Sequence, residues 1–135
     1  MDIAFATKLA ERMEAGQDIQ VKGYLCSSND GAGETFGFCA AGLACDIIAH
    51  EEGSGWEWSE PLMGANKVQL VRRFVNIDMR DSGLYSPPVV VKERLGLDLT
   101  CELMGLNDDG KTWTELAKYL RSEIAVARDV ESADG

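Results

Sequence analysis

Four side chains able to do chemistry occur in one apolar stretch, residues 38–50. They are the thiols of Cys39 and Cys45, the carboxylate of Asp46 and the only histidine of the chain, His50. A thiolate and an imidazole in contact form a nucleophilic pair. On a helix, however, Cys39 and His50 would lie about 16 Å apart, which excludes that pair. Asp46 and His50 lie one turn apart, where they form either a proton-sharing pair or an ordinary surface contact.

The stretch 38–50 itself is predicted to be a helix. At about 100° per residue, Cys39, Leu43, Asp46 and His50 share one edge, while the remaining apolar residues face elsewhere. We expect Cys39 and Asp46 to contribute this edge to a ligand-binding pocket. The alternative is a core helix with a polar edge and no further role.

A second candidate lies in the segment Asn107-Asp108-Asp109-Gly110, where an amide and two carboxylates precede the last predicted helix. Paired carboxylates can serve as acid and base, but Asn and Asp are equally typical of turns and caps. No further oxygen ligands follow at the spacing of a calcium loop, so we expect no metal and no cofactor. We expect the loop carrying Asn107 and Asp108 to form the other wall of the pocket.

Charge is distributed unevenly along the chain, which carries −10 overall. Four basic side chains and one carboxylate give residues 66–80 a net +3, leaving −13 on the rest. The basic side chains are Lys67, Arg72, Arg73 and Arg80. Arginine forks bind phosphate oxygens in pairs, so this stretch is either an anion site or a solvated strand face. Trp58 and Tyr85, with Trp56, offer stacking surface for a base unless they belong to the core.

Composition limits the classes of protein and partner. The chain has 135 residues, 45% of them hydrophobic, which is enough for one domain with its own core. The net charge of −10 opposes non-specific binding to DNA, RNA or anionic membrane. Residues 1–5 lack the features of a signal peptide, and no apolar run reaches the length of a membrane span. We therefore expect a cytoplasmic protein that binds neither nucleic acid nor membrane directly.

The cysteines are predicted to be reduced and structural. They are Cys26, Cys39, Cys45 and Cys101. Their spacing is irregular and includes no Cys-x-x-Cys pair, which leaves a zinc ribbon or a thioredoxin-type motif without support. Only Cys39, near the start of its helix, keeps an option for thiol chemistry.

The order of elements predicts an α+β fold, with three to four helices packed on a small, mostly antiparallel sheet. Helices are expected from Asp2 to Gly16, over 38–50, from Ser86 to Gly96, and from the capping box Thr112-Trp113-Thr114-Glu115 onward. Strands are expected over 19–25, 74–80 and 97–106. Residues 1–131 form the single domain, and 132–135 a disordered tail.

Four blocks of the sequence resemble a family of small phage and prophage proteins. The blocks are Gly23-Tyr24-Leu25, Phe38–Asp46, Tyr85-Ser86-Pro87-Pro88-Val89 and Leu106–Trp113. The family shows Gly-Tyr-Leu, a helix of the type Cys-Cys-Leu-Gly-Val-Leu-Cys-Asp, Tyr-Leu-Pro-Pro, and Leu-Asn-Asp before an aromatic. The order is the same, and only about 53–84 is left uncovered. Here Ala40 replaces the second cysteine and Ser86 replaces a leucine.

The resemblance implies a phage accessory protein that acts against host defence in the cytoplasm of an infected bacterium. The leading hypothesis is a non-catalytic protein that binds and sequesters a nucleotide-type immune signal. The first alternative is an acidic protein–protein inhibitor of a defence enzyme, similar in manner to an anti-CRISPR protein. The second is a carboxylate- or metal-dependent hydrolase of such a signal using Asp46, Asp108 or Asp109. A homo-oligomer stays open, because the sequence specifies no interface.

Overall fold

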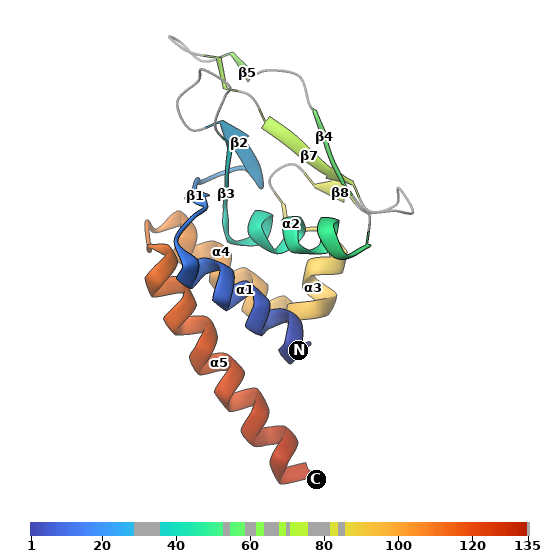
Figure 1. Ribbon diagram of the computed structural model, residues 1–135, viewed down its shortest axis with the longest axis vertical. Helices are drawn as coiled ribbons and strands as arrows, with labels where there is room; N and C mark the ends of the chain where they lie inside the picture. Colours follow the sequence, from blue (N-terminus) through green and yellow to red (C-terminus); the bar gives the residue numbers. More distant parts are fainter. Residues whose placement is uncertain are drawn as a thin grey trace.

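Helix α2 (Ala40–Glu52) lies between a β-sheet and the other helices (Figure 1). The computed structural model describes residues 1–28, 36–52, 55–58, 62–63, 68–69, 71–75, 82–83 and 86–134. All residues of α2 from Ala40 to Ile48 are buried. A helix that is apolar around its whole circumference is stable only when neighbours cover all of its sides. The sheet covers one side of α2, and the helical layer covers the other.

The main sheet has the strand order β1-β3-β2-β7-β4. These strands are β1 (Ile19–Gln20), β3 (Phe36–Phe38), β2 (Cys26–Ser28), β7 (Val71–Val75) and β4 (Gly55–Trp58). Strand β8 (Ser82–Gly83) pairs with the second half of β7, and β5 (Leu62–Met63) pairs separately with β6 (Val68–Gln69). The pairing is antiparallel throughout, apart from β1 with β3. The prediction of an α+β domain with a mostly antiparallel sheet is therefore confirmed.

The helical layer consists of α1 (Ile3–Ala15), α3 (Val89–Leu95), α4 (Leu97–Asp108) and α5 (Trp113–Asp134). Helix α1 forms as predicted: the Asp2 side chain accepts a hydrogen bond from the Phe5 amide at 3.0 Å, and Gly16 ends the helix at φ 66°. The positive φ is a conformation that glycine adopts without strain. None of the helices in the described ranges is long and apolar enough to cross a bilayer.

Helix α5 begins at the predicted capping box. The Thr112 hydroxyl accepts from the Glu115 amide at 3.3 Å, and the Glu115 carboxylate accepts from the Thr112 amide at 3.3 Å. The helix ends at Asp134, inside the range 132–135 that was predicted to be a tail. Beyond the N-terminal start of α1, α5 extends away from the rest of the chain (Figure 1).

The strand predicted over 97–106 is wrong, because this segment is helix α4. Leu99 and Leu103 are buried one turn apart against the other helices, which is a helical spacing. The described residues thus hold five helices instead of three to four. Of the predicted strand 19–25, only the first two residues form β1, and β2 starts just after it.

Two other boundaries differ from prediction. Strand β7 begins at Val71, before the predicted start at 74, and the predicted remainder over 76–80 lies outside the described residues. The N-cap of α3 is Pro88 rather than Ser86, while Gly96 ends the helix as expected.

Helix α2 is fixed to the sheet by a very close contact at Gly42. A Cβ atom at this position would lie 1.7 Å from the carbonyl oxygen of Leu25. The Cys39 amide donates to that same carbonyl at 3.3 Å. Only glycine leaves room for this approach, so the first turn of α2 rests directly on the backbone that leads into β2.

Candidate functional site

Asp46, on the predicted polar edge of α2, is buried and fully engaged within the chain. It is 7% exposed. Its Oδ2 lies 2.6 Å from Nη1 of Arg12, and its Oδ1 accepts a hydrogen bond from Nε1 of Trp56 at 3.0 Å. Arg12 belongs to α1 and Trp56 to β4. Asp46 therefore ties the helical layer to the sheet through α2.

The guanidinium of Arg12 is also fully used. Its Nε and Nη2 donate to the two oxygens of Asp18, each at 3.0 Å, while Nη1 faces Asp46. Burial lowers the pKa of Arg12, but hydrogen bonds to Asp18 and Asp46 outweigh it and raise the pKa above its ordinary value. With both of its edges directed at carboxylates, Arg12 has no fork left for an anionic ligand.

His50 makes a different contact from the one expected. Its Nδ1 lies 2.8 Å from the main-chain oxygen of Asp46 and 3.7 Å from the carboxylate, and its side chain is 76% exposed. The imidazole therefore binds mainly to the helix backbone. Beside it, a groove of about 560 Å³ runs between α1 and α2, lined by Lys8, Glu11, Arg12, Ile47, His50 and Glu51.

This groove carries both signs of charge, and its charges pair with one another. Lys8 lies 2.5 Å from Glu51, and Arg94 pairs with both Glu51 and Glu52. The hydrogen bond from Lys8 lowers the pKa of Glu51 below its usual range. A groove whose cations are neutralised in this way offers little attraction to a phosphate.

Cys39 is a buried, neutral thiol. It is fully buried, its sulfur accepts from the Gly42 amide at 3.3 Å, and it lies 3.9 Å from the sulfur of Met104. Burial raises the pKa of Cys39 to about 11 and that of Cys26 to about 12. Thiols in this state act as small hydrophobic side chains, and only Cys101 is exposed.

Asn107 lies in α4 instead of a loop, and its amide holds the chain together. Its Nδ2 donates to the Val21 carbonyl at 2.9 Å, and its Oδ1 accepts from Gln20 at 2.9 Å. The side chain is fully buried. Because Cys39, Asp46 and Asn107 are all buried and bonded within the chain, they do not form the accessible pocket that we expected. Asp108 ends α4 and is exposed.

The two neighbouring arginines of β7 do not act together. Successive strand residues point to opposite faces, so Arg72 and Arg73 lie on different sides of the sheet. The Arg72 guanidinium lies 4.2 Å from the centre of the Phe36 ring, whereas Arg73 is exposed and opposite Glu57 in the register. One phosphate cannot contact both. Lys67, Arg80, Tyr85 and the side chain of Trp58 lie outside the described residues.

Trp56 is partly buried and packs against the hydrophobic core. Its ring centre lies 5.6 Å from that of Phe74 and 5.8 Å from that of Phe38. With its Nε1 bonded to Asp46, the indole has no free N–H donor for a base.

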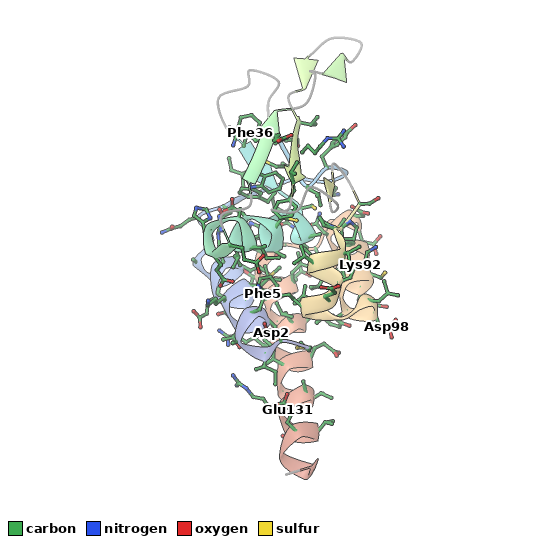
Figure 2. All side chains as sticks on the ribbon, turned by 90° about the vertical axis from the view of Figure 1, so that its right-hand side faces the viewer. Asp2, Phe5, Phe36, Lys92, Asp98 and Glu131 are labelled. Carbon is green, nitrogen blue, oxygen red and sulfur yellow. The ribbon has the colours of Figure 1, made fainter. Side chains whose placement is uncertain are left out.

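The most conspicuous outer surface was missed from the sequence: it is the exposed face of α4. The exposed residues of α4 and of its C-cap Asp109 follow a helical spacing and include four carboxylates: they are Leu97, Asp98, Cys101, Glu102, Gly105, Asp108 and Asp109. Figure 2 shows Asp98 at the outer side of the molecule. Helix α4 contains no Lys, Arg or His, and within the described ranges none of these carboxylates forms an ion pair. The i, i+4 spacing of Asp98 and Glu102 could have indicated an acidic helix face. It was not used, because this segment was predicted to be a strand.

Two features of this α4 face have no stabilising role in the chain. Gly105 lies in the helix interior, where a Cβ atom would meet nothing within 4 Å, although glycine there costs about 0.5–1 kcal/mol relative to alanine. Asp108 lies at the C-terminal end of the helix, where the helix dipole disfavours a negative charge. Both features suit an outer contact better than they suit the isolated domain.

A second outer feature follows α5. Val126 and Val130 are 58% and 56% exposed, although they lie one turn apart on the part of the helix that extends from the body. Nearer the start of α5, a groove of about 440 Å³ is lined by Leu106, Lys111, Glu115, Lys118, Tyr119 and Ser122. Burial and the nearby carboxylates of Glu123 and Glu102 raise the pKa of Tyr119.

Comparisons with protein-family models, with curated proteins and with solved structures find no match for this chain. Among the described residues, no group of three or more His, Cys, Asp or Glu side chains is arranged to hold a metal ion. The assignment of function therefore depends on the surfaces described above.

Proposed function

We propose that the protein is a non-catalytic inhibitor that binds a basic surface of a partner protein through the outer face of α4. The observation that carries this proposal is the row of four carboxylates on α4, which no cation of that helix accompanies. Negative charges that have no neighbouring cation on the same helix face do not stabilise the folded chain. It does increase the rate of encounter with an oppositely charged partner and the preference for it.

The dimensions of the face suit a site that normally binds a polyanion. From Asp98 to Asp109 it extends about 16 Å along the helix. Arginine and lysine side chains that bind phosphates bind carboxylates by the same charge-assisted hydrogen bonds. Gly105, in the middle of the row, leaves the helix backbone open to close approach by a partner side chain.

The resemblance to phage proteins supplies the class of partner in this proposal. A nucleic-acid-binding enzyme of bacterial defence has a basic site, and an acidic protein in the cytoplasm of an infected bacterium would block that site. Sequestration of a nucleotide-type signal stays a prediction. It has less support from the geometry, because Cys39, Asp46 and Asn107 are used within the chain. A hydrolase based on Asp108 and Asp109 likewise has no metal cluster among the described residues.

The test uses two variants of equal charge. In the first, Asp98→Asn, Glu102→Gln and Asp108→Asn neutralise the α4 face. In the matched control, Glu11→Gln, Glu57→Gln and Glu93→Gln neutralise exposed carboxylates on α1, β4 and α3. Each set removes three negative charges from a chain of net −10, so both variants carry −7.

Proteins retained from a bacterial lysate by the immobilised wild type are identified, purified and titrated against all three proteins. We expect the affinity to fall at least tenfold for the α4 variant and less than twofold for the control, and to weaken as salt is raised from 50 to 300 mM. If both variants lose the same amount of affinity, the effect is due to net charge alone, which would overturn the proposal. Retention of the same proteins by all three would also overturn it.

A further inference from the structure

Helix α5 is longer than the structure that supports it. It has 22 residues, against 13 in its neighbour α1, or about 33 Å against 20 Å. Its last buried residue is Ile124, and Glu131 lies well beyond the body of the molecule in Figure 2. From residue 125 to residue 131, every side chain is exposed except that of Ala127, which is partly buried.

This projecting part is not built to stand alone in water. Val126 and Val130 expose more than half of their surface there. Valine is a weak helix former, and a helical segment of about ten residues has marginal stability without tertiary packing. Apolar residues of low helix propensity indicate that another surface covers this turn.

The two valines continue the α4–α5 groove. At about 100° per residue, Tyr119, Val126 and Val130 fall within about 40° of one another around α5. Tyr119 lines the groove, together with Leu106 and Ser122. The groove and the valines thus form one strip along α5, about 100° around the helix from the residues that pack into the core.

Charges beside the strip match a second copy of the same strip in reverse. Lys118 and Asp129 lie on the same side of the strip, within about 20° of each other and about 16 Å apart along α5. Both are exposed, and neither forms an ion pair within the described ranges. They are equally far from the point between residues 123 and 124, so an antiparallel pair centred there brings each Lys118 beside Asp129 of the second copy.

We infer that two copies of this chain associate through antiparallel packing of their α5 helices about a two-fold axis near residues 123 and 124. In this arrangement Val126 and Val130 of each copy cover the groove of the other, between Tyr119 and Ser122. The interface is isologous, as in most homodimers. The inference does not depend on the proposed function, although a dimer would present two α4 faces to a partner at once.

Glu123 is expected to weaken the dimer. Glu123 lies next to the two-fold axis, so the two copies of this carboxylate approach each other. Like charges at an interface weaken it. The pairing is therefore expected to be weak, and Glu123→Gln is expected to strengthen it.

The test is sedimentation equilibrium of the full chain at concentrations up to about 1 mM. Wild type is expected to form a species of twice the monomer mass. Lys118→Asp and Asp129→Lys should each raise the dissociation constant at least tenfold, because each change places like charges together at both symmetric contacts. The double variant exchanges the two charges and should return the constant to within threefold of wild type. Glu123→Gln should lower it.

Arg128→Asp is the matched control. It makes the same charge change as Lys118→Asp but lies on the side of α5 opposite to the strip, so dissociation should change less than twofold. A wild type that stays monomeric at 1 mM would overturn the inference, as would a double charge exchange that fails to restore association. A dimer that persists in the variant Val126→Ser with Val130→Ser would also overturn it. Circular dichroism identifies any variant that has lost its helices.

Discussion

Asp46 and Asp108 have the same carboxylate side chain, but one is buried and the other is exposed. Asp46, on α2, is buried and bonded to Arg12 and Trp56. Asp108, at the end of α4, is exposed and without an ion pair in the described part of the chain. Both carboxylates were expected to line one pocket, but only Asp108 is accessible.

The difference shows that availability decides which of two similar side chains can bind a partner. A buried group whose hydrogen bonds are all made within the chain contributes to stability, and removing it leaves its partners unsatisfied. An exposed charge without a partner contributes little to stability and is free to act on another molecule. Changes on α2 should therefore affect folding, while changes on α4 should affect binding.

The largest expected effect is at the contact between α2 and Leu25. Gly42→Ala would place a Cβ atom 1.7 Å from the Leu25 carbonyl oxygen, so the backbone of α2 must move. We expect a loss of about 4 kcal/mol in the free energy of unfolding, or failure to fold. Urea denaturation followed by circular dichroism measures it. A loss below 1 kcal/mol would show that α2 is not fixed on β2 as described.

The next effect tests the polar edge of α2. Asp46→Ala leaves Arg12 with one carboxylate partner and Trp56 with a partly buried N–H that has lost its acceptor, which should lower the free energy of unfolding by about 3 kcal/mol. Trp56→Phe removes only the indole donor and should cost less, about 1 kcal/mol beyond the change in packing. As the matched exposed change, Asp108→Ala should leave stability within about 0.5 kcal/mol. If Asp46→Ala and Asp108→Ala lower the free energy of unfolding equally, α2 and α4 do not differ in the way described.

A smaller effect separates buried from exposed thiols. At pH 8 iodoacetamide should label Cys101 in the folded protein, while the other three cysteines react only after unfolding. Burial raises the pKa of Cys39 to about 11 and that of Cys26 to about 12. Because these thiols ionise first in the unfolded chain, their contribution is fully present below about pH 9 and is lost as pH rises toward the folded values.

At pH 10 the free energy of unfolding should be lower by about 1 kcal/mol for each of the two thiols than at pH 8. Urea titrations at the two pH values measure this difference. In Cys39→Ala the free energy of unfolding should fall by about 1 kcal/mol less between pH 8 and pH 10 than in wild type, because one of the two thiols is gone. This comparison holds however much the substitution itself destabilises the protein. An identical pH dependence in both proteins would show that Cys39 is not buried as a neutral thiol.

The smallest effect has the opposite sign to the first. Gly105→Ala on α4 is the same substitution as Gly42→Ala, but its Cβ meets nothing within 4 Å. It should raise the free energy of unfolding by about 0.5–1 kcal/mol, because alanine is the better helix former. If α4 binds a partner closely, the bulkier Gly105→Leu should weaken binding while the fold stays stable. A destabilising Gly105→Ala would mean that this glycine serves the fold.

The elements that were predicted correctly are those with local signals at both ends or along one face. Asp2 and Gly16 define α1, and the capping box of Thr112 and Glu115 starts α5. Helix α4 was missed because Leu97–Leu106 is mainly apolar, and the helical spacing of Asp98 and Glu102 within it was not used. Its helical form depends on packing against α2 and on the hydrogen bond from Asn107 to Val21, which is 86 residues away in the sequence.

Prediction of the candidate site from the sequence was limited for the same reason, because its contacts come from residues that are distant in the sequence. The sequence placed Asp46 on the correct edge of α2, since helical spacing is local. Its partners Arg12 and Trp56 come from α1 and β4, and no local pattern identifies them. Arg72 and Arg73 were both expected to contribute to one anion site, but strand geometry sends adjacent side chains to opposite faces.

The unequal support along α5 has a consequence for amide hydrogen exchange. Up to Ile124 the helix is packed into the core, so its amides should exchange only when the whole domain opens. After Ile124 the turns have no packed layer among the described residues, and their amides should exchange through local fraying. One continuous helix would thus report two opening energies. The protection of its final turns would then measure, residue by residue, whatever molecule comes to cover them.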